Sequence, residues 1–297
     1  MDKKISVIIN FYNGERYLSQ CLKSVLNQDY ENLEVILWDN CSSDNSKKII
    51  KSYEDKRIRY FLNRKKETLY KARNQAILQT SGELIAFLDC DDWWEKNYIS
   101  SRASLFPDAY YDYYYSNANF YYEKKKYTKI YKKYKLPEGI IFDQLSKDYF
   151  IIISGVIFKK KLFSEFGLFD DTFNVIGDYD FIMKISKFCN AHGNNLPLIN
   201  YRIHDENFSK LHSEIFFEEY KRWFENNNID KKDIKFQKNI KFFRNKLNYL
   251  EITSLLMNKK KNLLLIKKIL QHEMIFEKIK FLILFFLPKR FFKFLKK

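Results

Sequence analysis

Residues 82–92 read Gly-Glu-Leu-Ile-Ala-Phe-Leu-Asp-Cys-Asp-Asp, an apolar run that ends in three carboxylates. Leu84–Leu88 has the unbroken apolar character of a strand buried on both faces of a sheet. Asp89 and Asp91 follow at i and i+2, so their carboxylates can converge on one hard cation such as Mg²⁺ or Mn²⁺. A solvated acidic loop before a helix is the alternative. Because ligands of open α/β sheets bind beyond the carboxyl ends of the strands, the position favours a metal site.

The residues before this stretch repeat the strand pattern, with helical spacing between the strands. The other expected strands are Ile5–Ile9, Leu33–Trp38 and Ile58–Phe61, and the expected helices are Tyr17–Asn27, Asp44–Tyr53 and Leu69–Thr80. Apolar strands separated by helices indicate a parallel sheet covered on both faces. The sequence therefore predicts an α/β fold.

The pattern changes after residue 95. A helix is expected over Lys96–Phe106, then an aromatic strand over Tyr110–Tyr122, joined by a turn to a Lys/Tyr-rich strand within Glu123–Lys135 near a sheet edge. Ile151–Lys159 and helices over Lys161–Phe166 and Tyr179–Lys187 complete a mixed α/β unit. From about Ser213 the pattern is helical and basic. We predict two regions, residues 1–212 and 213–297.

Composition excludes several classes of protein. The chain has 297 residues, of which 18% are aromatic, so it can bury a large core and is not intrinsically disordered. Its longest apolar run, Phe281–Leu287, is far shorter than the about 20 residues that span a bilayer. The first residues show no signal-peptide pattern, so a cytoplasmic location is expected. The four cysteines are scattered, which indicates reduced thiols rather than a zinc site or disulfide framework.

The formal net charge of +16 is concentrated at one end of the chain. Residues 221–297 hold 21 basic and 6 acidic side chains, and residues 278–297 hold seven basic and none acidic. Phe291, Phe292 and Leu295 share one helical face there. This composition suits an interfacial helix on an anionic membrane, or a helix packed on the catalytic domain with a solvated basic face. Nucleic-acid binding is disfavoured because no recognition motif accompanies the charge.

Other polar side chains belong to the same predicted crevice. Asp39–Asp44 follows a strand, where a carboxylate or amide can bind a nucleobase and Asp44 can cap the next helix, although an Asx-rich turn is the alternative. Arg73 lies on the helix before Leu84–Leu88 and can reach a diphosphate, unless it is a surface arginine. Trp93 and Trp94 follow the carboxylates, and we expect one to stack on a sugar and the other to pack in the core. His192, His212 and His272 are expected at the surface.

Taken together, these motifs resemble family 2 glycosyltransferases with the GT-A fold. Ser6–Asn13, Asp39–Asp44, Ala72–Asn74 and Gly82–Asp92 are similar to the nucleotide-sugar half. Acceptor-side motifs are matched by Ser154-Gly155, Phe166–Asp170, Gly177–Asp180 and Tyr201–His204. The resemblance covers roughly residues 4–210. It implies a Rossmann-like, mainly parallel mixed sheet, with the nucleotide-sugar half in residues 1–95, the acceptor half in 96–212 and a basic helical extension.

The resemblance also implies a role for individual residues. The nucleoside would be held by Asn10, Tyr12, Asp39 and Asn40, the base or diphosphate would be bound by Arg73, and Asp89 would face the ribose and metal side. Asp91 and His204 would bind Mn²⁺ or Mg²⁺. The catalytic base would be Asp178. Helix capping is the alternative role for Asp178, and Asp180 is a second candidate cap. The chain departs from the family pattern at Asn10, a frequent proline, at Asn40, often aspartate, and at Gly177, often glutamate.

The expected activity is that of an inverting, metal-dependent glycosyltransferase. The donor would be a nucleotide-sugar, most simply a UDP-sugar, and the acceptor a lipid-linked saccharide. The abundance of Lys, Asn, Ile, Phe and Tyr is typical of an AT-rich bacterial genome, which suggests surface-glycan assembly on the inner face of the cytoplasmic membrane. Two alternatives are a glycosyltransferase that uses a polyprenyl phosphate as acceptor and a non-catalytic nucleotide-binding or membrane scaffold.

Overall fold

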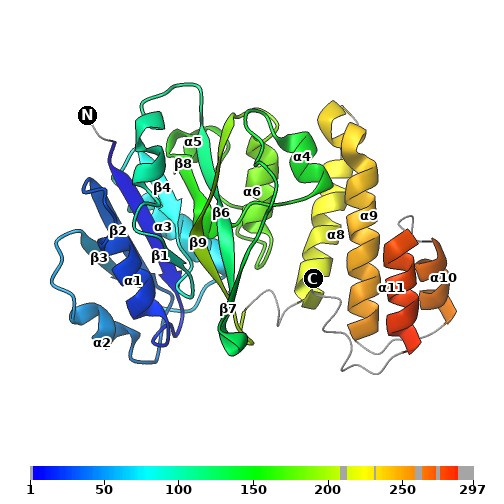
Figure 1. The fold of residues 1–297 in the computed structure, drawn as a ribbon, viewed down its shortest axis with the longest axis horizontal. Helices are drawn as coiled ribbons and strands as arrows, with labels where there is room; N and C mark the ends of the chain where they lie inside the picture. The colour runs from blue at the N-terminus through cyan, green and yellow to red at the C-terminus, as the bar shows by residue number, and fades with distance from the viewer. Residues whose placement is uncertain (1–2, 208–212, 231, 258–262, 272–274, 287–297) are drawn as a thin grey trace. The chain divides into compact units, whose positions relative to one another are not determined.

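The computed structural model describes residues 3–207, 213–230, 232–257, 263–271 and 275–286. It divides into two compact units, residues 1–207 and residues 208–297 (Figure 1). The first unit contains a nine-stranded sheet and its helices, and the second is helical.

The sheet of the first unit is mixed. Its strands run in the order β3-β2-β1-β4-β8-β6-β9-β5, and β7 pairs with β6 outside this path. Strand bounds are β1 (Ile5–Phe11), β2 (Leu33–Asp39), β3 (Ile58–Leu62), β4 (Leu84–Phe87), β5 (Trp93–Trp94), β6 (Tyr113–Tyr122), β7 (Tyr127–Ile130), β8 (Val156–Lys159) and β9 (Ala191–Ile203). The first four strands in sequence are parallel, which confirms the predicted α/β sheet.

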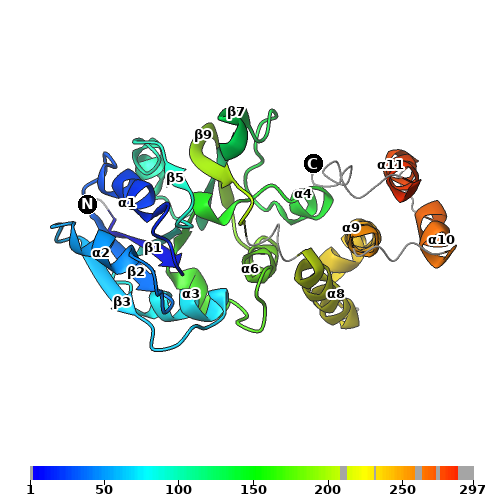
Figure 2. The same cartoon turned by 90° about the horizontal axis from the view of Figure 1, so that it is seen from below.

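Helices cover both faces of the parallel part of the sheet. The helices of this unit are α1 (Leu18–Leu26), α2 (Ser46–Lys51), α3 (Leu69–Leu78), α4 (Phe142–Lys147), α5 (Lys161–Glu165) and α6 (Gly177–Ile185). Alternate residues of β1 and β2 pack with α1 and α2 in the main core, and α3 packs on the opposite face of these strands (Figure 2). Asp44 Oδ1 accepts a hydrogen bond from the Ser46 backbone N–H at 3.0 Å, so it caps the first turn of α2 as expected, although that helix begins at Ser46.

Strand direction decides which residues meet at one edge. β8 is antiparallel to both β4 and β6, and β9 is parallel to β6. β9 therefore points the same way as β1, β2 and β4, so its carboxyl end lies at the edge where those strands also end. The topology thus brings residues after β9 toward the carboxylates after β4.

One prediction for the middle of the chain was wrong, and one strand was absent from the predicted elements. The helix expected over Lys96–Phe106 is a 3₁₀ helix, Ser100–Leu105, because hydroxyls of serines in this segment bond nearby carbonyls and favour a tight turn. The long strand β9 was not predicted, because Gly193, two asparagines and Pro197 read as a loop. The strand accommodates them through register shifts opposite Ser116–Ala118.

The second unit consists of packed helices. They are α8 (Ser213–Ile229), α9 (Ile234–Met257), α10 (Leu263–Gln271) and α11 (Ile275–Phe286). The Trp223 ring of α8 meets the Phe243 ring of α9 edge to face, and α9, α10 and α11 share a small apolar cluster that includes Ile252, Leu265 and Phe281. None of the helices in the described ranges is long and apolar enough to cross a membrane. Phe291, Phe292 and Leu295 of the predicted interfacial helix lie outside the described residues.

A carboxylate inside the first unit ties β2 to its neighbours. Glu34 is 5% exposed, and its Oε1 accepts hydrogen bonds from Ser6 Oγ at 2.6 Å and from the Ser81 backbone N–H at 2.6 Å. Arg59 Nη1 lies 3.1 Å from Oε2. Burial alone would raise the pKa of Glu34, but these hydrogen bonds outweigh it and lower the pKa to about 2.

The low pKa of Glu34 predicts a pH dependence of stability. A group with a depressed pKa stabilises the fold above its unfolded pKa and loses that contribution as the pH falls toward 2. We expect Glu34→Gln to lower the free energy of unfolding at pH 7 by up to about 3 kcal/mol. Denaturant titrations should show this difference shrinking between about pH 5 and pH 3. The exposed Glu54→Gln is the control, and a pH-independent difference for Glu34→Gln would contradict the assignment.

Candidate active site

Carboxylates from three parts of the chain gather at the carboxyl edge of the parallel strands. Asp39 is the last residue of β2, Asp89 and Asp91 follow β4, and Asp178 lies in the first turn of α6. His204 follows β9 directly. Each of these carboxylates has a specific hydrogen-bond partner, and the partners differ in chemistry.

Asp91 and His204, the two predicted metal ligands, lie side by side. His204 Nε2 is 2.9 Å from Asp91 Oδ2, and Asn207 Nδ2 donates to the same oxygen at 3.3 Å. His204 is buried, whereas the Asp91 side chain is 25% exposed. One carboxylate oxygen and one imidazole nitrogen fit a divalent cation that takes its other ligands from phosphate and water. No group of three or more metal-ligating side chains was found within the described ranges.

Arg202 holds the loop that carries Asp91. Its backbone N–H donates to Asp92 Oδ1 at 2.9 Å, and its Nε donates to the Asp91 carbonyl at 2.8 Å. The rest of the guanidinium is equally engaged. Nη2 donates to Gln20 Oε1 at 2.6 Å, and the group lies 4.6 Å from each of the ring centres of Tyr17 and Trp93. In the sequence, Arg202 belongs to the motif Tyr201–His204 without a role of its own, although its position two residues before His204 places both at the end of one strand.

Asp92 lies behind this loop and is almost fully buried. Ser154 Oγ donates to its Oδ2 at 2.6 Å, and the Asp89 backbone N–H donates to Ser154 Oγ at 3.2 Å. Burial, and next the nearby Asp91 and Asp89, raise the pKa of Asp92 well above its usual value. The Asp92–Ser154 pair therefore anchors the loop from inside the protein.

Arg73 pairs with Asp89. Its Nη2 lies 2.5 Å from Asp89 Oδ1, and the arginine is 2% exposed, so it is not the surface arginine of the alternative prediction. Burial raises the pKa of Asp89 by more than the Arg73 charge lowers it. Repulsion by the Asp91 and Asp178 carboxylates raises this pKa further. In this structure the guanidinium holds Asp89, and its predicted contact with a base or diphosphate stays a prediction.

The predicted nucleoside residues lie at the ends of β1 and β2. Asn10 is buried, and neither atom of its amide has a hydrogen-bond partner among the described residues. Tyr12 is exposed, with Lys66 Nζ 3.6 Å from its ring centre. Tyr60 OH donates to Asp39 Oδ2 at 2.8 Å. The Asn40 amide bonds the backbone of Glu67 through both of its ends, which holds the loop before α3.

Backbone strain marks the same loops. Asn13 and Cys41 adopt left-handed φ values of 53° and 70°, which are uncommon outside glycine and gather at functional sites. Asn13 Oδ1 accepts a hydrogen bond from the Ser43 backbone N–H at 2.9 Å, which joins the two loops. The pair of strained loops therefore forms one rigid edge beside Asp39.

Asp178, the predicted catalytic base, is bound by a tyrosine. Tyr70 OH donates to Asp178 Oδ1 at 2.6 Å. Tyr70 lies three residues before Arg73 on α3, so both side chains leave the same helical face. No predicted role falls on Tyr70, and its helical spacing from Arg73 was the signal available in the sequence.

The two tryptophans after the carboxylates differ in environment. Trp94 is 3% exposed, stacks on Tyr98 at 4.1 Å and donates from Nε1 to the Ser154 carbonyl, so it packs in the core. Trp93 is half-buried beside Arg202, and sugar stacking on it stays a prediction. His192 is partly buried between tyrosine rings, and His212 and His272 lie outside the described residues.

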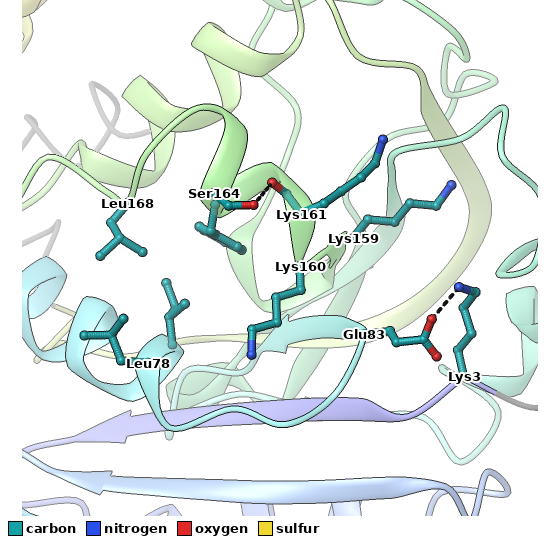
Figure 3. A pocket seen from close by; sticks show the side chains of 10 residues that line it. Lys3, Leu78, Glu83, Lys159, Lys160, Lys161, Ser164 and Leu168 are labelled. Carbon is teal, nitrogen blue, oxygen red and sulfur yellow. Dashed lines mark hydrogen bonds and ion pairs between the residues drawn. The ribbon is translucent and has the colours of Figure 1, made fainter.

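A hollow of about 680 Å³ lies away from these carboxylates, at the amino ends of β1 and β4 (Figure 3). Its lysines are engaged by their own neighbours: Lys3 by Glu83, Lys159 by the Asp108 carbonyl and Lys160 by the Thr80 carbonyl. Ligands of parallel sheets bind at the opposite end of the strands. The hollow therefore is not the candidate active site.

Known proteins of similar fold are glycosyltransferases. The mannosyltransferase PcManGT from Pyrobaculum calidifontis, in complex with GDP-Man and Mn²⁺, has a TM-score of 0.64 at 13% identity, over 99% of this chain and 84% of PcManGT. S. aureus TarS 1–349 in complex with UDP-GlcNAc has a TM-score of 0.57 at 18% identity, over 85% of each chain. The structure is thus a GT-A fold with added C-terminal helices, as expected.

Sequence similarity specifies the family. Residues 6–167 match the family described as Glycosyl transferase family 2. WfgD of Escherichia coli, described as UDP-Glc:alpha-D-GlcNAc-diphosphoundecaprenol beta-1,3-glucosyltransferase, is 30% identical over 75% of this chain and 85% of its own length. Glycosyltransferase GlyA of Streptococcus pneumoniae serotype 4 is 31% identical over 56% of this chain, which spans about a quarter (26%) of GlyA. The chain belongs to glycosyl transferase family 2 and is a glycosyltransferase.

Arg202 provides a test of the loop geometry. Lysine keeps the charge but cannot donate to the Asp91 carbonyl and to Gln20 Oε1 at the same time. We therefore expect Arg202→Lys to lower kcat/KM at least about tenfold, which is equivalent to the loss of one hydrogen bond to a charged group. Steady-state kinetics and a thermal melt would measure this. The control is Arg244→Lys, an exposed arginine on α9. Wild-type kcat/KM in Arg202→Lys would show that the loop does not depend on the guanidinium.

Proposed function

We propose that this enzyme transfers a sugar from a UDP-sugar to a lipid-linked saccharide with inversion at the anomeric carbon. The observation that carries the proposal is the placement of Asp91 with His204 at one strand edge, with Asp178 on α6 at the same edge. The name of WfgD supports the class of donor and acceptor, since it specifies UDP-Glc and a diphosphoundecaprenol-linked sugar.

The donor half would use the residues at the ends of β1, β2 and β4. Asn10, Tyr12, Asp39 and Asn40 would bind the nucleoside, since Asn10 has both amide atoms without a partner among the described residues. Asp89, held by Arg73, would face the ribose. Asp91 and His204 would hold Mn²⁺ or Mg²⁺, which as a Lewis acid would neutralise the departing diphosphate.

The acceptor half would use Asp178 as general base. A carboxylate accepts the proton of the acceptor hydroxyl as its oxygen attacks the anomeric carbon, and such a base contributes roughly 10²–10⁴-fold. Attack from the face opposite the leaving diphosphate inverts the configuration. A phosphate acceptor is already ionised and needs no such base, so a fully active Asp178→Asn would favour a polyprenyl phosphate instead.

Membrane attachment would bring the enzyme to a lipid-linked acceptor. On α11, Phe276, Ile279, Ile283 and Phe286 are exposed, by 82% and 76% at the two phenylalanines. Their spacing of three and four residues places them on one helical face. Lys278 and Lys280 lie on the same helix, and the region 221–297 is strongly basic. An apolar stripe with basic neighbours suits an anionic leaflet, which on this reading is the inner face of the cytoplasmic membrane.

A donor panel tests the proposed reaction. UDP-, GDP- and dTDP-sugars would be incubated with the enzyme and an extracted lipid-linked acceptor, with Mn²⁺, Mg²⁺ or EDTA, and nucleotide release recorded. We expect one UDP-sugar to react with metal, and Asp91→Asn to lower the rate at least about a hundredfold, since it removes a charged metal ligand. Asp29→Asn, at an exposed position, is the control. Full activity in EDTA or in Asp91→Asn would contradict the metal site.

Flotation with liposomes tests the attachment. Replacing Phe276 and Ile283 by Ser removes two large apolar side chains from the exposed face of α11, each worth about 1.5–3 kcal/mol when buried. Binding to vesicles that contain phosphatidylglycerol should fall at least about tenfold. Ile229→Ser, on the equally exposed position of α8, should bind as the wild type does. Unchanged binding of the double variant would exclude this face as the attachment site.

A further inference from the structure

The first turn of α6 and one face of α3 are tied by a set of hydrogen bonds. Thr68 Oγ1 donates to the Asp171 carbonyl at 3.2 Å, and the Asn74 amide makes two bonds to the backbone of Phe169, at 2.9 and 3.1 Å. Tyr70, between them, lies 2.9 Å from the Val175 carbonyl and 2.6 Å from Asp178 Oδ1. The helix that follows the nucleotide-side loop thereby holds the whole segment that leads to Asp178.

The Tyr70 ring is held on several sides. It is 1% exposed, its centre lies 5.6 Å from the Phe169 ring, and the Arg73 guanidinium lies 5.3 Å above it. A methyl group on Gly177 would lie 2.6–2.8 Å from three ring carbons. Glycine at 177 is therefore what allows the ring to reach the start of α6 and its hydroxyl to reach Asp178.

The Tyr70 hydroxyl stays protonated and donates a hydrogen bond. Burial, and next the Asp178 carboxylate, raise the pKa of Tyr70 well above its usual value, against the opposite effect of Arg73. A phenol has a single proton, so it serves one acceptor at a time, and a carboxylate is a stronger acceptor than the Val175 carbonyl. The shorter distance is the one to Asp178.

We propose that Tyr70 is the positioning residue for the catalytic base: its hydroxyl fixes Asp178 Oδ1, which leaves Oδ2 to receive the proton of the acceptor. This inference rests on the proposed function, because it needs Asp178 to be the base. It explains why a buried tyrosine points its hydroxyl at Asp178, and why position 177 carries no side chain.

Four other ionisable side chains lie close enough to Asp178 to interact with its carboxylate. Tyr70 and Arg73 face it from α3, Asp89 from the loop after β4, and Tyr149 from the segment before β8. Arg73 is bound to Asp89 at 2.5 Å, so its charge is largely opposed by that carboxylate. Tyr70 therefore supplies the direct hydrogen bond to Asp178 in this group.

Removing one oxygen atom tests the inference. Tyr70→Phe should lower kcat about ten- to a hundredfold, the range of one hydrogen bond to a charged group, with little change in the KM of the donor. Tyr113→Phe is the matched control, since Tyr113 is equally buried on β6 and its hydroxyl has no partner in the described part of the chain.

A second variant covers the case in which Tyr70→Phe does not fold. Replacing Tyr70 by 3-fluorotyrosine keeps the shape and makes the phenol a stronger donor, so kcat should change while the KM of the donor stays the same. Wild-type kcat in the variant that folds, with Asp178→Asn inactive, would overturn the role of Tyr70 and leave the proposed function intact. Wild-type kcat in Asp178→Asn would overturn the base assignment itself, and this inference with it.

Discussion

Repulsion between carboxylates is the constraint that organises this active site. Four of them gather at one sheet edge, and each is stabilised by a different kind of donor: Asp89 by the Arg73 guanidinium, Asp91 by His204 and Asn207, Asp92 by Ser154 and a backbone N–H, and Asp178 by Tyr70. These donors come from α3, from β9 and the segment after it, and from the turn before β8. The sheet must therefore be closed through β8, β6 and β9 before the carboxylates can be held together.

The strands and helices that depend on a local sequence pattern could be predicted from the sequence. Unbroken apolar runs such as Leu33–Trp38 have one stable placement, between two layers of helix, and the polar residues after them fall at the ligand edge by strand direction alone. Asp39 and Asp91 could be placed in this way, whereas Asp178, at the start of α6, was indicated only by the resemblance to the family. The aromatic run Tyr110–Tyr122 likewise formed the long strand β6, because alternating large rings fit a pleated, half-buried surface.

What could not be foreseen depends on contacts between distant segments. Arg202 lies on a strand that contains Gly193 and Pro197, and these are tolerated because β6 shifts register beside them. Tyr70 meets Asp178 because the loop from Phe169 to Ile176 turns back onto α3. Neither the strand that carries Arg202 nor the loop from Phe169 to Ile176 has a hydrophobic periodicity that would predict its course. The prediction of an α-helix around Ser100–Leu105 was wrong for a local reason. Serine hydroxyls there compete for the backbone carbonyls, and a 3₁₀ turn satisfies them better than an α-helix does.

The fit of the Tyr70 ring against Gly177 has an evolutionary consequence. The two positions occupy one volume, so a larger side chain at 177 excludes the ring, and loss of the ring leaves a hole that a larger side chain can fill. Neither change is tolerated well alone, because one gives a clash and the other a cavity. Among descendants of an ancestral sequence the two positions should therefore be exchanged together, with tyrosine accompanied by glycine and a longer residue at 177 accompanied by a small one at 70.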